Sequence, residues 1–254
     1  MEWVVSMQMS GARWAWLLAA TFLLGTIVVA LMSLNITAPA PQFAADASLP
    51  DRIFANFKAI QAAWLQDAGS SVLFAVGFLS IAALGPILRA ILGPDDPRAA
   101  RMAVLFVVAG TVGILSQVIY IGGKEVASVP YYCDCEFGPA QLISRGAILD
   151  VLVGIQDWLL STAIVVLSLG FLSTAELARD WKWTNTFVAV TRLLAIAGFA
   201  TVAWNRIAVP MLADAQVDLP YDLIGLGLIA AVAGVGVPLW SILLGRTLTA
   251  DGAS

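Results

Sequence analysis

The chain has 254 residues, of which 60% are hydrophobic and only 12% are charged, and its mean hydropathy is +0.90. Soluble domains contain about 45–50% apolar and about 25% charged residues, so this composition indicates a membrane protein. The net charge is −4 and there is no basic run, which argues against nucleic acid as a partner. The chain contains no histidine, which excludes a His-ligated haem or zinc and a Ser-His-Asp triad. No cofactor is predicted.

Six apolar segments are long enough to cross a bilayer, which takes about 20 helical residues for about 30 Å of hydrocarbon. Because lipid offers no hydrogen-bond partners to the backbone, apolar runs of this length favour helices over barrel strands. The predicted fold is all-α, a single domain formed by a bundle of six transmembrane helices. The segments are residues 14–34, 70–92, 102–123, 149–173, 186–208 and 222–245.

The first segment, 14–34, exceeds the about 7–15 apolar residues of a signal peptide, which favours a retained helix. Small residues in 37–47 (TAPAPQFAADA) leave a cleaved leader as the alternative. Lys and Arg are more frequent in the connections on the side of the termini, so both termini are predicted to be cytoplasmic. With this orientation the inner side carries Arg13, Arg89, Arg98, Arg101, Arg179, Lys182 and Arg246. The outer side carries Arg52, Lys58, Lys124 and Arg145, with Arg206 at its border.

Residues 48–67 (SLPDRIFANFKAIQAAWLQD) predict an amphipathic helix on the outer face of the membrane. Ser48 and Asp51 have the spacing of a capping box, and Pro50 falls in the first turn. Apolar side chains then recur at helical spacing, namely Ile53, Phe54, Phe57, Ile60 and Trp64. The helix either lies on the membrane surface or packs as a lid over the bundle.

The stretch PYYCDCEFGP (130–139) contains both cysteines of the chain, Cys133 and Cys135, in a predicted outer loop. Structural zinc requires four ligands, and two thiols without histidine do not supply them, so no metal site is predicted within one chain. Cys133 and Cys135 are a candidate disulfide, because two residues span a distance within disulfide reach, although the small ring is strained. Free thiols and intermolecular disulfides are the alternatives.

Ionisable residues at membrane depth are costly and mark candidate functional sites. Asp150 and Asp157 lie seven residues apart, on one face of the segment 149–173. A short connection makes this segment the antiparallel neighbour of 186–208. If the hairpin folds about residues 178–179, Asp150 is level with Arg206, which predicts an ion pair between them. The alternative is two charges solvated independently at the interface.

Asp157 has no cation at its level in this scheme. Gln117 and Tyr120, on the segment 102–123, lie at a similar depth from the outer face. We therefore expect a hydrogen-bonded polar cluster of Asp157, Gln156, Gln117 and Tyr120. Such a cluster is either a polar contact between helices or a relay for protons or cations.

Two further features concern the fifth and sixth segments. Arg192 is about two turns from the inner surface, where its side chain reaches lipid phosphate or Glu176. Ala230 and Gly234 have the small-xxx-small spacing that permits close helix approach, and Pro238 predicts a kink.

The layout of six helices, the long outer segment after the first, and the runs GILSQVIYIGG and LVGIQDWLLSTAIVVLSLGFL resemble a bacterial six-helix membrane family that carries only a domain-of-unknown-function label. The Cys-Asp-Cys loop departs from that family's pattern, and the resemblance implies no functional residues.

The sequence favours a non-enzymatic multi-pass protein of the bacterial cytoplasmic membrane, acting as a structural, accessory or interaction subunit. Intramembrane diacid proteases need acids on two helices, whereas Asp150 and Asp157 share one. The expected partners are the lipid bilayer and another membrane protein or a second copy of the chain. The alternative is a small transporter or channel that uses Asp157 in a polar cavity for a proton, ion or small solute.

Overall fold

The computed structural model describes residues 2–34, 36, 44, 46–128, 138–214 and 221–251. In these ranges every regular element is a helix, and two of the helical segments are π-helical (η). The elements are α1 (Glu2–Ser33), α2 (Leu49–Ala62), α3 (Trp64–Leu92), α4 (Pro97–Ser128), α5 (Pro139–Asp180), α6 (Asn185–Ala203), η2 (Trp204–Ala208), α7 (Val209–Asp214), α8 (Tyr221–Ile229), η3 (Ala230–Gly236) and α9 (Val237–Asp251).

Six helices in the described ranges are long and apolar enough to cross a membrane. Each predicted apolar segment overlaps one of them, which confirms the all-α, six-helix fold and makes the chain a multi-pass membrane protein. The spans are Ser6–Ser33, Trp64–Leu92, Pro97–Glu125, Pro139–Asp180, Asn185–Leu212 and Gly227–Ala250.

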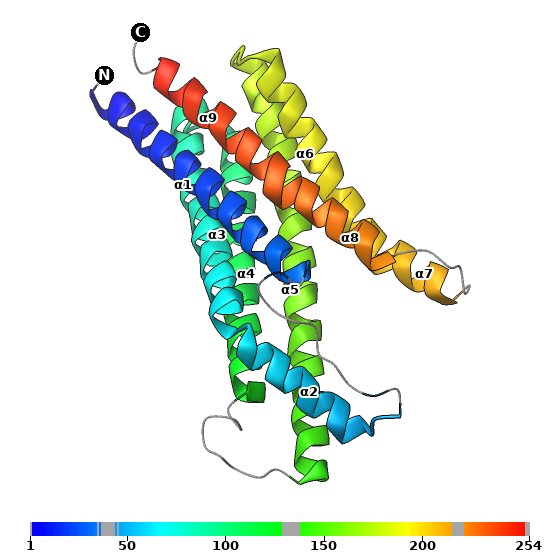
Figure 1. Ribbon diagram of the computed structural model, residues 1–254. Helices are drawn as coiled ribbons and strands as arrows, with labels where there is room; N and C mark the ends of the chain where they lie inside the picture. The colour runs from blue at the N-terminus through cyan, green and yellow to red at the C-terminus, as the bar shows by residue number, and fades with distance from the viewer. Residues whose placement is uncertain are drawn as a thin grey trace.

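The helices form an elongated bundle in which α3, α4 and α5 run side by side along the long axis (Figure 1). Helices α1 and α9 cross this group obliquely and pack against each other, and α6 packs against α5. The first and last described residues lie at the same end of the bundle, which we call the termini end. Helix α2 lies across the opposite end, which we call the α2 end.

An aromatic cluster holds α4, α5, α6 and α9 together toward the termini end. Trp240 is fully buried, and its ring lies 4.8 Å from that of Phe171 and 6.1 Å from that of Phe106. Its indole Nε1 donates a hydrogen bond of 3.0 Å to Thr191 Oγ1 on α6. The one polar atom of this large side chain is therefore satisfied inside the core, as buried indoles generally are.

Glycines allow α3 and α4 to approach closely. A methyl group at Gly110 would lie 2.5 Å from the carbonyl oxygen of Phe78, and one at Gly85 would lie 2.7 Å from that of Ala103. Such contacts are too short for any side chain larger than hydrogen. The α3–α4 contact is thus made by backbone against backbone, as small residues permit in membrane helices.

The two π-helical segments each end shortly before a proline. Pro210 follows η2 by two residues, and Pro238 follows η3 by two. Proline has no N–H and its ring clashes with the carbonyl four residues earlier, so the preceding turn widens. The sequence predicts a kink at Pro238, and the structure has a π-helical turn there inside a continuous helical stretch. The predicted close approach at Gly234 is to α1, where a methyl group would lie 2.7 Å from Thr26 Cγ2.

Helix α2 is shorter than the predicted helix 48–67, because the chain turns at Ala63 and Trp64 begins α3. The expected cap is present, since Ser48 Oγ accepts a hydrogen bond of 3.4 Å from the backbone N–H of Asp51. The apolar face of α2 packs on α5, where Phe57 is buried against Leu142 and Leu149. Its apolar residues thus contact protein, as in the lid interpretation.

Candidate functional site

Helix α5 is much longer than a bilayer requires. Its 42 residues span about 63 Å at 1.5 Å per residue, about twice the 30 Å of a hydrocarbon core. Since the hydrocarbon takes only about 20 of its residues, α5 also extends beyond the hydrocarbon, and its first turns pack on α2.

Helices α3 and α4 also extend toward the α2 end and carry a buried ion pair there. Lys124 Nζ of α4 lies 2.5 Å from Asp67 Oδ2 of α3, and the two side chains are only 14% and 8% exposed. The Tyr120 hydroxyl lies 3.3 Å from Asp67 Oδ1, and the Lys124 ammonium also bonds to that hydroxyl. The ammonium lies 4.2 Å from the centroid of the Tyr120 ring as well. The aspartate charge is thus compensated by an ammonium and a phenol.

A second ion pair joins α5 to η2 and is more exposed. Arg206 Nη2 lies 3.9 Å from Asp157 Oδ2, and Arg206 Nε donates a hydrogen bond of 2.9 Å to Ser161 Oγ. The guanidinium carbon also lies 4.9 Å from the centroid of the Trp158 ring. The side chains of Asp157 and Arg206 are 49% and 25% exposed, so this pair opens onto the surface of the bundle.

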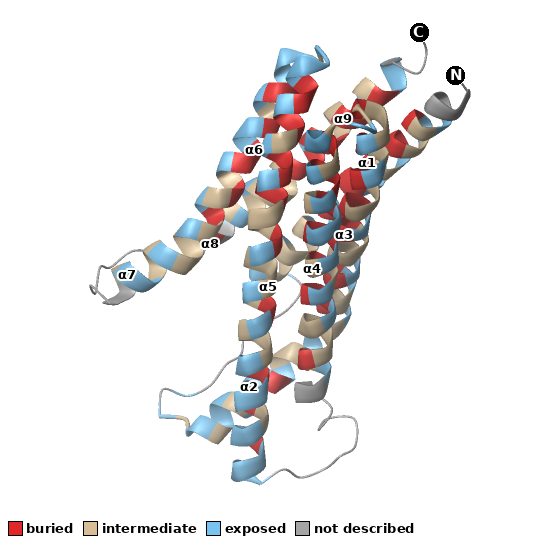
Figure 2. Ribbon diagram, turned by 180° about the vertical axis from the view of Figure 1, so that it is seen from behind, coloured by how far each residue is buried: buried red, intermediate tan, exposed pale blue. Residues whose placement is uncertain are grey.

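A row of exposed apolar side chains continues along α5 beside this ion pair. Ile148, Val151 and Ile155 are 47%, 61% and 44% exposed, and Trp158 links the row to Arg206. Their spacing of three, four and three residues places them on one face of the helix. Viewed from behind, much of the surface of α5 toward the α2 end is exposed (Figure 2). We call Ile148, Val151, Ile155 and Trp158 the α5 face.

The structure changes the predicted partners of Asp150, Asp157 and Arg206. Arg206 pairs with Asp157, and Asp150 is exposed on α5 without an ion pair to a described residue. The predicted Asp150–Arg206 pair is wrong because the α5–α6 turn lies at residues 181–184, about one helical turn later than 178–179. With the turn at this later position, Arg206 lies at about the level of Asp157 and not at that of Asp150.

The predicted polar cluster does not form as one unit. Tyr120 contacts Asp67 and Lys124, and the amide nitrogen of Gln117 donates to Ser116 Oγ at 3.3 Å. Gln156 is buried on α5. Asp157 itself faces Arg206 and not the Gln117 side chain.

The remaining predicted positions carry no site in the described part of the chain. Cys133 and Cys135, the candidate disulfide, lie outside the described residues. Among the residues that are described, no group of three or more His, Cys, Asp or Glu side chains could hold a metal ion. Arg192 and Glu176 are both exposed, and no ion pair between them is found in the described ranges.

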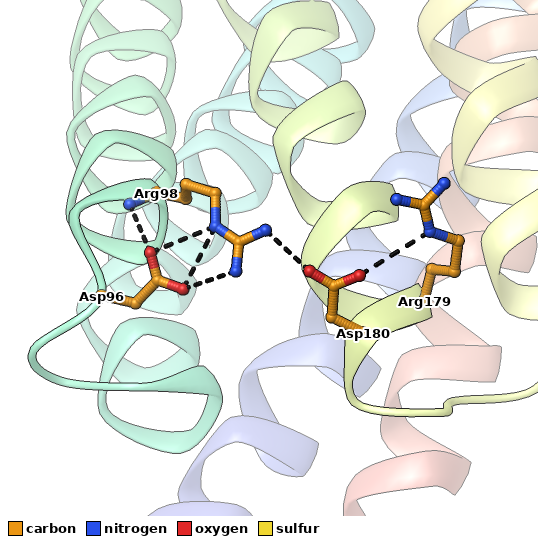
Figure 3. A network of polar contacts seen from close by, with 4 residues as sticks. All are labelled: Asp96, Arg98, Arg179 and Asp180. Carbon is orange, nitrogen blue, oxygen red and sulfur yellow. Dashed lines mark hydrogen bonds and ion pairs between the residues drawn. The ribbon is translucent and has the colours of Figure 1, made fainter.

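The termini end has its own polar network, which connects α4 to α5 (Figure 3). Arg98 Nη1 lies 2.7 Å from Asp180 Oδ2, and Arg98 Nη2 lies 2.9 Å from Asp96 Oδ2. Asp96 also caps α4, because its Oδ1 accepts a 2.7 Å hydrogen bond from the backbone N–H of Arg98. Hydrogen bonds from the Arg98 side chain, and then from its backbone, hold the pKa of Asp96 below its usual value. The network fixes the ends of the two helices at the water-facing side.

The Asp67–Lys124 pair was missed by the sequence analysis, although the sequence contains a signal for it. Helices α3 and α4 form a hairpin about the loop 93–96. Asp67 and Lys124 lie at nearly equal distances from that loop, so antiparallel packing brings them level. Pairing residues that lie at equal distances from the connecting loop, as for α5 and α6, would have predicted this ion pair.

Comparison with known proteins adds no relative: no protein-family model, curated protein or solved structure matches the chain.

Proposed function

We propose that the chain is a non-enzymatic, multi-pass protein of the bacterial cytoplasmic membrane that acts as an interaction or accessory subunit. Its α5 face binds a helix of another membrane-protein subunit. The observation that carries this proposal is the exposed apolar row on α5, which ends at the half-exposed Asp157–Arg206 pair. An exposed apolar row that ends at an ion pair offers a partner helix both an apolar surface and a polar contact.

The Asp157–Arg206 pair supports the same function. A half-exposed ion pair on membrane-spanning helices is costly unless water or protein covers it. A helix docked on the α5 face would cover Trp158 and the guanidinium stacked on it. Polar side chains of the partner would then complete the hydrogen bonds of Arg206, whose contact with Asp157 is long at 3.9 Å.

The orientation proposed for this subunit has both termini in the cytoplasm. Seven arginines and lysines lie toward the termini end of the six spans, against five toward the α2 end, and an excess of Lys and Arg identifies the cytoplasmic side of bacterial membrane proteins. The α5 face then lies on the outer side, where it would meet the extracytoplasmic part of a partner.

Co-purification with face-specific variants tests the interaction. The wild-type protein is extracted in mild detergent and compared with the double variant Val151→Ser, Ile155→Ser. The matched control is Val118→Ser, because Val118 is 58% exposed on α4, almost as much as Val151 at 61% on α5. We expect a partner to be retained by the wild type and the control and lost from the double variant. Equal retention by all three would contradict the proposal.

A transporter or channel for a proton, ion or small solute is the second candidate. The π-helical turns η2 and η3 favour it, since such turns are frequent at functional sites and transporters often contain interrupted helices. Arg206 lies on one of these turns. Proton or cation flux into reconstituted vesicles, lost in Asp157→Asn, would favour this candidate, because an amide cannot exchange protons at neutral pH.

A further inference from the structure

A groove at the termini end, on the surface between α3 and α4, is a feature separate from the α5 face. Its volume is about 440 Å³, which falls within the about 300–1,000 Å³ of small-molecule sites. The residues that shape it are Pro86 and Arg89 of α3 and Ala103, Val104, Val107 and Val108 of α4.

Small residues between the helices create this groove. At Gly85 the backbones of α3 and α4 come so close that a methyl group would lie 2.7 Å from the carbonyl oxygen of Ala103. Ala103 and the ring of Pro86 then leave a hollow on the outward side. Val104 and Val107 are exposed along it, so the hollow faces lipid and not the core.

Arg89 lines the groove near its mouth, and Arg101 is the residue next to Ala100 of the lining. Arg89 Nε and Nη2 donate hydrogen bonds of 3.3 and 3.2 Å to the carbonyl oxygen of Pro94, which fix the guanidinium at the mouth and leave Nη1 available. Arg101 lies three residues before Val104, on the same face of α4, and is exposed without an ion pair to a described residue. Asp95 and Asp96 in the adjoining loop are the neighbouring acids, and Asp96 is compensated by its ion pair with Arg98.

The groove is also oriented like a lipid molecule, with its mouth at the water-facing end and its long axis along α4. Between Ala100 near the mouth and Val108 it follows α4 for about 12 Å into the hydrocarbon, at 1.5 Å per residue. A charged mouth at the water-facing end and an apolar stem below it suit a ligand with an anionic head and an alkyl chain. Basic pockets between transmembrane helices are known to hold anionic headgroups.

We propose that this groove binds an anionic phospholipid of the leaflet at the termini end. Its phosphate lies against Arg89 and Arg101, and one acyl chain lies along Val104, Val107 and Val108. The positive headgroup of a zwitterionic lipid would be repelled by the two arginines, which gives the site its preference for net negative charge. This inference does not rest on the function proposed for the α5 face.

The test measures lipid retention on the purified protein by native mass spectrometry. Phosphatidylglycerol and phosphatidylcholine with identical acyl chains are added separately, and inorganic phosphate forms a third arm. We expect phosphatidylglycerol to be retained in preference to phosphatidylcholine. The preference should fall about 5-fold for each of Arg89→Gln and Arg101→Gln. The control Arg246→Gln, on α9 away from the groove, should keep the wild-type preference.

A second variant distinguishes lipid binding in the groove from a general attraction of anionic lipid to positive charge. Val104→Phe fills the stem while both arginines remain, and it should weaken phosphatidylglycerol retention even if the arginine variants fail to fold. Equal retention of the two lipids by the wild type would overturn the proposal. So would arginine variants that behave like Arg246→Gln, or binding of inorganic phosphate as strong as that of phosphatidylglycerol.

Discussion

Among the described residues, Lys124 and Asp67 are the charged side chains whose removal should affect stability most. Both come from the ends of long helices, and their pairing ties the corner between α2 and α3 to α4. Burying two charges costs desolvation energy that the pair only partly recovers, so the pair itself adds little net stability. Losing one partner, however, leaves the other charge buried and uncompensated.

Lys124→Met should therefore lower the free energy of unfolding by about 3 kcal/mol. The double variant Lys124→Met, Asp67→Asn should recover most of this loss, because the uncompensated carboxylate is gone. Denaturant unfolding in detergent measures both, with Lys58→Met on the exposed surface of α2 as the control. Single and double variants of equal stability would contradict a buried pair.

Asp96 should make the stability of the termini end depend on pH. Its pKa is held below the usual 3.8 by the hydrogen bonds from Arg98, so the unfolded chain binds the proton more readily than the folded one. The stability that Asp96 contributes is full above about pH 4 and is lost as the pH falls through the folded-state pKa.

Asp96→Asn keeps a capping side chain but removes the charge. The melting temperature of the wild type should exceed that of Asp96→Asn at pH 6, and the difference should shrink as the pH falls below about 4. Thermal unfolding in detergent across this range measures it. A difference that stays constant with pH would show that the carboxylate of Asp96 contributes nothing beyond the cap.

At the scale of the helices, the hydropathy of the sequence predicts the spans well, because an apolar run of about 20 residues has few alternatives to a membrane helix. The positions of the turns are harder to predict. Residues 174–180 are polar enough to suggest a loop, yet they continue α5 to Asp180, because Ala175, Leu177 and Ala178 are buried against other helices. Because of this extra turn, Arg206 lies level with Asp157 and not with Asp150.

The length of α5 was underestimated for a similar reason. The predicted segment 149–173 follows hydropathy, whereas the helix begins at Pro139. Its first turns are stabilised by tertiary contacts, since Leu142 packs on Phe57 and Gly146 packs on Ile53 of α2. Contacts between distant elements leave no local pattern in the sequence.

The close approach of α3 and α4 gives a prediction with an internal control. At Gly110 an added methyl group would lie 2.5 Å from Phe78 O and 2.8 Å from Ala82 N, so the two backbones would have to separate. Gly110→Ala should destabilise the protein by about 1–3 kcal/mol. Gly122→Ala, on the same helix but with open space around it, should be neutral or stabilising by up to about 1 kcal/mol.

Unfolding of both variants in detergent checks this contrast. If Gly110→Ala and Gly122→Ala change stability equally, the helices do not meet backbone to backbone at Gly110.

For the whole molecule, six spans with both termini on one side give an alternating topology. Reporter fusions after residues 45, 97, 135, 180 and 215 should read outside, inside, outside, inside and outside. Compartment-specific reporters, active on only one side of the membrane, measure this directly. A cytoplasmic signal at residue 135 would overturn the proposed orientation and the predicted position of the Cys133–Cys135 loop on the outer side of the membrane.

The central claim, that another protein covers the α5 face in the membrane, is tested most directly by photo-cross-linking in intact cells. A photoreactive residue replaces Val151 or Ile155 on the α5 face, and Val118 on α4 is the matched control with similar exposure. We predict a discrete product of higher mass from 151 and 155 and none from 118. A product at twice the mass of the chain would identify the partner as a second copy. No product at 151 and 155, or the same products at all three positions, would contradict the claim.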